Sequence, residues 1–300
     1  MQYATYRFSA ETNARLGEVG LRPLDVEAIA LRALEEDIDD GVDVTTIATV
    51  PAEQRGRLAF VARSGGVIAG QIVAAAIFDV VCGDEHTVEF CVEEGAQVDA
   101  GTEVMAITAS THQLLRGERP ALNLLSHLSG IATATRAWVQ AVQGTSARIR
   151  DTRKTTPGLR YLEKYAVRMG GGVNHRMNLA DAALVKDNHI AAAGGVEQAF
   201  TAVRERFPDV PVEVEVDTLE QLDEVLDAGA DLVLLDNFSI DQMTEAVSRN
   251  AGRARLEASG GLSLDRAAAV AATGVDYLAV GALTHSAPVL DIGADLVVLG

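Results

Sequence analysis

Residues 211–237 read PVEVEVDTLEQLDEVLDAGADLVLLDN, and they contain the unit from which the second half of the chain is built. Two short apolar runs, VEVEV and LVLL, flank a segment whose apolar residues recur at helical spacing. A buried strand, a helix and a second buried strand in this order form a βα unit with parallel strands. The stretch therefore predicts a parallel sheet that is covered by helices.

The same alternation extends in both directions from about Ala147 onward. Further strand-like runs are ARIR, AALVK, ARLEA and YLAV, and the helical segments between them include RYLEKYAVRMG, GVEQAFTAVRERF, IDQMTEAVSRN and SLDRAAAVAATG. Roughly six strands in succession predict a closed or an incomplete α/β barrel. A doubly wound open sheet is the structural alternative, but no GxGxxG motif opens the first βα turn.

The first half of the chain has a different pattern. Residues 25–37 have helical periodicity, and short alternating runs with glycine turns predict strands within 56–70, 86–92 and 102–109 around one helix at 74–82. A long apolar-periodic stretch, 111–142, predicts one or two helices, since Pro120 and Gly130 can bend or break it. This half is therefore expected to be a small α+β unit.

Composition excludes several classes of function. The net charge of −18 argues against nucleic acid as the main partner, because phosphate binding needs a basic field. No apolar run is long enough to span a membrane, and the N-terminal residues lack the pattern of a secretory signal. Two cysteines, Cys82 and Cys91, are too few for a disulfide framework. A cytoplasmic protein is expected.

Charge is distributed unevenly in this acidic chain. Its three lysines, Lys154, Lys164 and Lys186, all lie within one window that begins near DTRKTTPG, residues 151–158. Lys164 is spaced around Glu163 as on a helix surface, so we expect it to be exposed. The other two follow strand-like runs, where an ion-paired helix surface does not explain them.

Each predicted strand of the second half ends in polar or glycine residues. Because such ends meet at one edge of a parallel sheet, we expect a shared active site there. The ends are Asp151-Thr152-Arg153-Lys154, Lys186-Asp187-Asn188-His189, Asp217 after Glu213 and Glu215, Asp236-Asn237, Ser259-Gly260-Gly261, and Gly281-Ala282 with His285 beyond.

The chemistry of these ends changes along the chain. The first two ends, with Arg176, are cationic and suit an anionic ligand. Glu215 and Asp236 are hard oxygen ligands suited to Mg²⁺ or to sugar hydroxyls. The two glycine-rich ends are predicted to begin helices and to bind a phosphate with backbone N–H groups. Phosphoribosyl pyrophosphate and an acidic acceptor would meet all three requirements.

The sequence also resembles a known family. The run TRKTTPGLRYLEKYAVRMGGGVNHRMNLADAALVKDNHI resembles the signature of quinolinate phosphoribosyltransferases, and the similarity continues through RGERPALNLLSHLSGIAT, VEVEVDTLEQ, LLDNFS, EASGGL and VGALTHS. It runs in order from about Leu24 to the end of the chain. One departure is Pro120, where a small residue such as threonine is expected.

This resemblance implies an α/β fold: an N-terminal α/β sandwich domain and an incomplete, seven-stranded barrel similar to a TIM barrel. The implied domains are residues 1–130, joined by the tail 287–300, and a catalytic barrel of 131–286. The implied reaction joins quinolinate to the phosphoribosyl group with loss of pyrophosphate and CO₂, yielding nicotinate mononucleotide. It implies Mg²⁺ as cofactor, no organic cofactor, and a homodimer or larger homo-oligomer with shared active sites.

The resemblance also assigns roles residue by residue. Lys154, Lys186, Glu215 and Asp236 would be catalytic, and the last two would hold Mg²⁺ directly or indirectly. Residues that would bind quinolinate are Arg119 (reaching a neighbouring subunit's site), Thr152, Arg153, His175, Arg176 and Lys186. Those that would bind phosphoribosyl pyrophosphate are Lys154, Glu215, Asp236, Ser259, Gly260, Gly261, Val280, Gly281, Ala282 and His285.

Three other functions compete with this one. The nearest is a related phosphoribosyltransferase of the molybdenum-operon type, acting on another pyridine acid. A Schiff-base lyase would use Lys186 as its nucleophile at a strand end. A sensor of phosphoribosyl pyrophosphate would bind without turnover, but both lysines and both acidic positions needed for catalysis are present.

Overall fold

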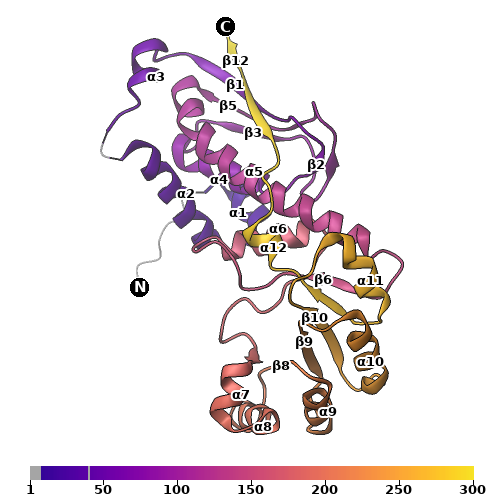
Figure 1. Ribbon diagram of the computed structural model, residues 1–300. Coiled ribbons are helices and arrows are strands. Elements are labelled where there is room, and N and C mark those ends of the chain that lie inside the picture. The colour runs from indigo at the N-terminus through magenta and orange to yellow at the C-terminus, as the bar shows by residue number, and fades with distance from the viewer. Residues whose placement is uncertain (1–7, 40) are drawn as a thin grey trace. The chain divides into compact units, whose positions relative to one another are not determined.

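The computed structural model describes residues 8–39 and 41–300 (Figure 1). The first seven residues, which the sequence assigns to the N-terminal domain, lie outside the described residues. The chain divides into two compact units by its contacts. The first contains residues up to Ala134, Thr156–Gly171 and Ser286–Gly300, and the second contains Thr135–Thr155 and Gly172–His285.

The first unit is built on a four-stranded antiparallel sheet in the order β12-β1-β5-β3. These strands are β1 (Arg55–Ala62), β3 (Thr87–Phe90), β5 (Glu103–Ser110) and β12 (Ile292–Leu299). A second small sheet pairs β2 (Gly66–Val67) with β4 (Gln97–Val98). Figure 1 shows β12, the last strand of the chain, alongside β1, with Arg55 opposite Leu299.

Helices of the first unit bury apolar faces against this sheet and against one another. They are α1 (Ala10–Glu18), α2 (Pro23–Ile38), α3 (Val44–Thr49), α4 (Gln71–Cys82), α5 (Thr111–Ala141, whose last residues belong to the second unit) and α6 (Arg160–Met169). Almost every residue of α4 is buried, which explains its nearly continuous apolar sequence. The expected helices and strands of this half are confirmed, and 111–141 forms a single helix through Pro120 and Gly130.

Gly130 lets the returning C-terminal segment touch α5. A Cβ atom at this position would lie 2.2 Å from the carbonyl oxygen of Pro288 and 2.9 Å from the Cα of Val289. Close by, the Leu290 N–H donates to the carbonyl of Ser126 at 3.0 Å. The tail 286–300 is therefore held against the helix by backbone contacts that leave no space for a side chain.

Replacing Gly130 with alanine is expected to lower the free energy of unfolding by about 1–3 kcal/mol, because rigid backbone atoms must move to admit the methyl group. Urea unfolding measures this change. Gly17→Ala in α1 is the matched control, since a Cβ there meets nothing within 4 Å. The control should stabilise the protein by up to about 1 kcal/mol, as alanine favours helix. Equal effects of both substitutions would contradict the role of Gly130.

Helix α6 departs from the sequence-based expectation in two ways. The sequence places it in the barrel, whereas its contacts group it with the first unit. Lys164, expected on an exposed helix surface, is fully buried, and so is its neighbour Glu163. A carboxylate oxygen of Glu163 accepts the Thr156 N–H at 3.0 Å, and the other lies 2.9 Å from His127 Nε2. The helical spacing of charges wrongly predicted an exposed surface, because consecutive residues around α6, from Leu162 to Val167, are all buried.

The second unit contains the predicted parallel sheet, in the order β6-β11-β10-β9-β8-β7. Its strands are β6 (Arg148–Arg150), β7 (Ala183–Val185), β8 (Val212–Val216), β9 (Leu232–Asp236), β10 (Arg255–Ser259) and β11 (Tyr277–Ala279). A single parallel bridge joins Arg150 of β6 to Val173, a residue that lies between β6 and β7 in the sequence. The described residues therefore form six of the seven expected strands, with this isolated bridge in addition, and the incomplete barrel is confirmed.

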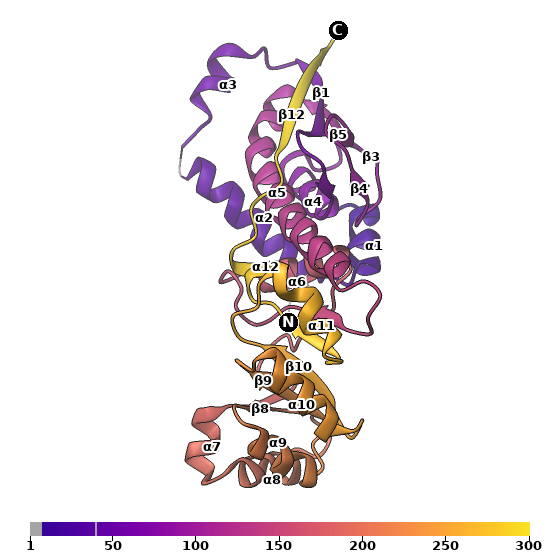
Figure 2. The same cartoon turned by 45° about the vertical axis from the view of Figure 1, so that its right-hand side comes forward.

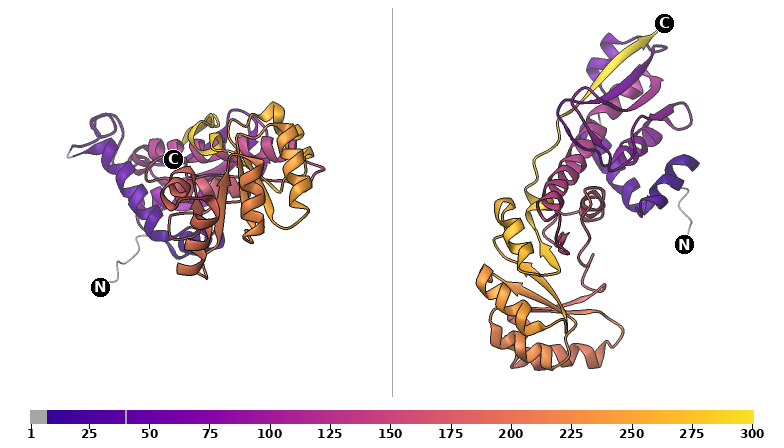
Figure 3. Two further views of the ribbon diagram at one scale, coloured as in Figure 1. Left: turned by 60° about the horizontal axis from the view of Figure 1, so that its bottom comes forward. Right: turned by 90° about the vertical axis from the view of Figure 1, so that its right-hand side faces the viewer.

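Helices follow the strands of this sheet in sequence. They are α7 (Asp187–Ala193), α8 (Val196–Arg206), α9 (Leu219–Asp227), α10 (Ile240–Asn250), the 3₁₀ turn η1 (Leu264–Arg266), α11 (Ala267–Ala272) and α12 (Ala282–His285). Figures 2 and 3 show α8–α11 along one side of the strands. Because all strands run in parallel, their carboxyl ends meet at one edge, as the site predicted from sequence requires. No helix among the described residues could span a bilayer.

Candidate functional site

A cavity of about 430 Å³ lies at the carboxyl ends of the strands in the second unit. It gathers nine of the residues predicted for the site from the sequence: Thr152, Arg153, Lys154, His175, Arg176, Lys186, Glu215, Asp236 and Ser259. They come from the ends of β6, β7, β8, β9 and β10 and from the loop before β7. Leu184, Leu234, Glu257 and Ala279 complete its lining.

The cationic side of the cavity holds two guanidinium groups with buried donors. The Nε atoms of Arg153 and Arg176 are both buried, and neither has a hydrogen-bond partner within the described residues. Arg176 is held by its Nη1, which donates to the carbonyl of Ala182 at 2.8 Å. Burial and the nearby charge of Arg153 lower the pKa of Arg176. Two partly desolvated cations that repel one another are well suited to an anionic ligand between them.

Lys186 and Glu215 link the cationic side to the acidic side. The Lys186 Nζ lies 2.5 Å from Glu215 Oε2, with Lys186 half-exposed and Glu215 mostly buried. Lys186 precedes α7, and its backbone N–H donates to His189 Nδ1 at 3.0 Å. Asp236, at the end of the next strand, accepts a hydrogen bond from Asn237 Nδ2 at 2.7 Å. Two carboxylates on neighbouring strands thus face one cavity, a donor set that fits Mg²⁺.

The glycine-rich ends differ in part from their expected geometry. Gly281 directly precedes α12, as expected, and a Cβ there would lie 2.9 Å from Lys154 Cδ and 3.3 Å from His285 Nε2. Thr284, in α12, donates to the carbonyl of Lys154 at 2.8 Å. The final glycine end is therefore packed against the first strand end, although it is not among the residues that line the cavity.

Gly260 and Gly261 do not begin a helix, contrary to expectation. Both have positive φ values, 87° and 55°, which a right-handed helix excludes. A Cβ at Gly260 would lie 2.2 Å from Asn237 Oδ1. The Ser-Gly-Gly segment is a turn that packs on the neighbouring strand end, and the next helical residues are those of η1, beginning at Leu264.

Four of the predicted residues lie outside the cavity lining for other reasons. Arg119 is on α5 in the first unit, with a largely exposed side chain 3.9 Å from Glu118. Val280, which directly follows β11, is buried, while Ala282 and His285 are exposed in α12. The contacts above bring His285 close to Gly281 and place α12 against Lys154 at the first strand end.

The cavity adjoins a set of buried charged groups, one of them its lining residue Glu257, that the sequence pattern largely failed to indicate. Glu213 and Glu257 project from β8 and β10 and are almost fully buried, with Arg150 of β6 forming an ion pair to Glu257. Burial and the nearby carboxylate of Glu213 raise the pKa of Glu257 to about 8, against the opposing effect of Arg150. In the sequence, the signal for a buried charge here was the glutamate between leucine and alanine in the strand-like run ARLEA.

The raised pKa of Glu257 predicts a pH dependence of stability. The folded state holds this proton more tightly than the unfolded chain, whose carboxyl titrates near 4.5. This contribution to stability is therefore complete below about pH 4.5 and is lost as the pH rises through about 8. Glu257→Gln, which resembles the protonated form, should flatten the decline in urea midpoint between pH 5 and 9. An unchanged slope in the variant would contradict the assignment.

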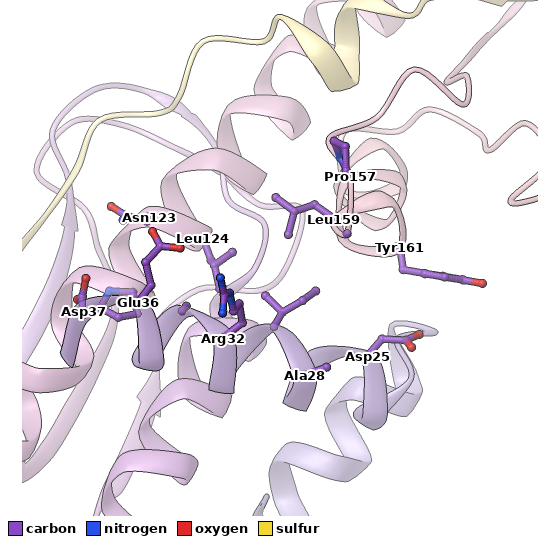
Figure 4. Close-up of a pocket in the computed structure, with 14 residues that line it drawn as sticks. Asp25, Ala28, Arg32, Glu36, Asp37, Asn123, Leu124, Pro157, Leu159 and Tyr161 are labelled. Carbon is purple, nitrogen blue, oxygen red and sulfur yellow. The ribbon is translucent and has the colours of Figure 1, made fainter. Parts of the chain in front are cut away.

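A larger cavity of about 660 Å³ lies in the first unit (Figure 4). It is lined by one side of α2, including Arg32 and Glu36, by Asn123 and Leu124 of α5, and by the segment 157–161. Its charges are of both signs, and its lining in the described chain contains none of the predicted site residues. Size alone does not identify the site, whereas the strand-end cavity combines convergent cations, carboxylates and buried donors.

Comparisons with known proteins give matches along most of the chain. Models of the quinolinate phosphoribosyl transferase family match residues 43–129 (N-terminal domain) and 131–295 (C-terminal domain). A nicotinate-nucleotide pyrophosphorylase (carboxylating) of Mycobacterium leprae is 56% identical over 269 residues, covering 88% of this chain and 95% of that protein. The crystal structure of NadC from Streptococcus pyogenes is 40% identical, covers 93% of this chain and 99% of its own, and superposes with a TM-score of 0.89. A nicotinate-nucleotide pyrophosphorylase structure from Francisella tularensis is 35% identical, covering 91% of this chain and 96% of that one, with a TM-score of 0.86.

Proposed function

Because the chain belongs to the quinolinate phosphoribosyltransferase family, we infer that it transfers the phosphoribosyl group of phosphoribosyl pyrophosphate to quinolinate. The products are nicotinate mononucleotide, pyrophosphate and CO₂, in the biosynthesis of NAD. Similarity along nearly the whole chain supports this reaction over that of a related enzyme for another pyridine acid.

The observation that carries the proposal is the pair of buried, unsatisfied guanidinium donors in one cavity. Arg153 and Arg176 can each direct an Nε–H to a carboxylate, and Lys186 adds a third cation beside them. Mutual repulsion of the two guanidinium groups is relieved most by a ligand with two negative charges. A dicarboxylate such as quinolinate therefore fits this side of the cavity better than a monocarboxylate, with Thr152 at its edge.

We assign the phosphoribosyl pyrophosphate to the opposite side of the cavity. Glu215 and Asp236 would hold Mg²⁺ or the ribose hydroxyls, and a bound Mg²⁺ ion would neutralise charge on the pyrophosphate. Lys154 lies between the two sides, next to Gly281 and His285. Ser259, Gly260, Gly261, Gly281 and His285 are proposed for the 5′-phosphate. Val280 and Ala282 are proposed as further residues that bind phosphoribosyl pyrophosphate.

In the reaction, the protein's main task is to align the two substrates. The C–O bond between ribose and pyrophosphate breaks as the pyridine nitrogen forms a bond to the same ribose carbon, and Lys154 stabilises the charge that develops on the leaving oxygen. The ring nitrogen is then positively charged. The bond to the adjacent carboxylate breaks, its electron pair stays on the ring carbon next to this nitrogen, and a proton replaces the CO₂. No organic cofactor is required for this electron flow.

A product assay tests the proposed function. Purified protein is mixed with phosphoribosyl pyrophosphate, Mg²⁺ and either quinolinate or nicotinate, and the release of pyrophosphate and of CO₂ is measured. With quinolinate as the acceptor, equal amounts of pyrophosphate and CO₂ are expected. With nicotinate, neither product is expected. Release of neither product with quinolinate would refute the function, and turnover of nicotinate without CO₂ would point to the related monocarboxylate enzyme.

We further propose a homo-oligomer in which Arg119 reaches the cavity of a neighbouring subunit. Its exposed position on α5 supports this assignment, because a guanidinium group held by one weak ion pair is available for a partner. A cytoplasmic location is favoured by the two unpaired cysteines, which suit a reducing compartment.

A further inference from the structure

Both ring nitrogens of His175 have partners that fix the orientation of the ring. The backbone N–H of Arg176 donates to His175 Nδ1 at 2.7 Å. On the other side, Nε2 lies 2.8 Å from Glu213 Oε2. The backbone is fixed as well, since the His175 N–H donates to Asp151 Oδ1, on a carboxylate that is fully buried.

These contacts determine which nitrogen carries the proton. A neutral imidazole has one donor and one acceptor nitrogen, and Nδ1 is already the acceptor for a backbone N–H. The proton therefore belongs on Nε2, which lies 2.8 Å from Glu213 Oε2. In this arrangement the ring N–H faces Glu213, which is not a lining residue of the cavity, and not an anion bound in the cavity.

The same geometry argues against a metal ion at this cluster. His175 Nε2 and carboxylate oxygens of Glu213 and Glu257 lie within 4.8 Å of one another, a combination of groups that can bind metals. However, a nitrogen that carries a proton has no lone pair for a metal. The guanidinium of Arg150 also supplies the positive charge here: it pairs with Glu257, lies 3.9 Å from Glu213, and stacks over the ring of Tyr277 at 4.6 Å.

We propose that His175 is a positioning residue for acceptor binding, and that Glu213 holds its ring so that Nδ1 fixes the backbone of Arg176. The sequence resemblance assigns His175 to the substrate itself, so this is a different role at the same site. The proposal rests on the proposed function only for the identity of the acceptor, quinolinate.

Arg176 needs such a support because its guanidinium is held near Arg153. Two like charges in a partly desolvated cavity separate unless other bonds hold them. The structure provides two anchors for Arg176, one from Nη1 to Ala182 and one from its backbone N–H to His175. Loss of the second anchor would allow the guanidinium to move away from Arg153 and from the acceptor carboxylate.

Substitutions at His175 separate the two roles. Asparagine places an amide oxygen near the position of Nδ1, where it can accept the Arg176 N–H, whereas glutamine places its amide near Nε2. We expect His175→Asn to keep a KM for quinolinate close to that of the parent, and His175→Ala and His175→Gln to raise it by about 10- to 100-fold. The KM for phosphoribosyl pyrophosphate should change little in any variant.

His86 provides a matched control in the first unit. Its ring also contacts a carboxylate, Asp79 at 3.1 Å, and a backbone carbonyl, that of Gly83 at 2.8 Å. His86→Ala should leave both KM values unchanged even if it lowers stability. The proposal is overturned if His175→Asn is as poor as His175→Ala, or if both substrates lose affinity equally.

A spectroscopic measurement on the unaltered protein tests the orientation of the His175 ring directly. It depends neither on the folding of the variants nor on enzyme activity. In protein labelled with ¹⁵N-histidine, long-range ¹H–¹⁵N spectra identify which ring nitrogen is protonated, and His175→Asn assigns the signal. The expected result is a neutral ring with the proton on Nε2, unchanged when quinolinate is added. A proton on Nδ1, or a ring that becomes doubly protonated with quinolinate, would overturn the role of His175. An enzyme inactive toward quinolinate could still show the expected tautomer, so the two failures are distinguishable.

Discussion

Alanine in place of Arg153 is expected to lower kcat/KM for quinolinate by about 100- to 1,000-fold, the loss seen when a preorganised donor is removed from a site of developing charge. The Nε of Arg153 is buried and has no partner within the described residues, so its hydrogen-bonding capacity is left for a ligand. Steady-state kinetics with each substrate varied in turn would measure the change.

The same substitution should not destabilise the fold. Removing Arg153 relieves its repulsion of Arg176 and removes an unsatisfied buried donor, so the urea midpoint should stay constant or rise. Arg153→Lys is the informative comparison, because it keeps the charge and loses the planar pair of donors. A near-normal rate for Arg153→Ala would remove this residue from the site.

Lys186→Ala is expected to reduce turnover by a similar factor of about 100 to 1,000, for two reasons. A cation that faces the acceptor is lost, and the carboxylate of Glu215, only 13% exposed, is left without the ammonium 2.5 Å away. That uncompensated negative charge would repel both anionic substrates. We expect Lys186→Arg to remain impaired, since a guanidinium group is too large for the position of a compact ammonium beside Glu215.

A double-mutant cycle tests the second of these reasons. Glu215→Gln added to Lys186→Ala removes the orphaned charge, so the double variant should bind quinolinate more tightly than Lys186→Ala alone. Binding can be followed by calorimetry without turnover. Strictly additive losses would mean that the ion pair has no part in acceptor affinity.

The position of the site could be predicted from the sequence because a parallel sheet imposes its own register. Glu215, Leu234 and Glu257 are aligned across β8, β9 and β10, so residues at equivalent places in successive apolar runs meet at one level. From the order of the strands alone, without any side-chain contacts, Arg153, Lys186 and Asp236 could be predicted to share one site, and all three line the same cavity.

What the pattern could not predict depends on packing between distant elements. Lys164 has the spacing of a surface residue, and only the tertiary contacts of α6 bury it. The partner of Glu257 is Arg150, about a hundred positions away in sequence, so neither residue alone indicated a pair. Gly260 is required because the chain here lies too close to Asn237 for a side chain. The sequence alone did not distinguish this packing role of glycine from a phosphate-binding role.

The pairing of β12 with β1 has a consequence for biosynthesis. Residues 292–299 occupy an edge of the sheet whose other strands lie within residues 55–110, so that sheet stays incomplete while the ribosome makes the entire barrel. Until then β1 presents an unpaired edge, the kind of surface to which chaperones and aggregating chains bind. The part of the molecule that is synthesised first is therefore expected to be the last to mature.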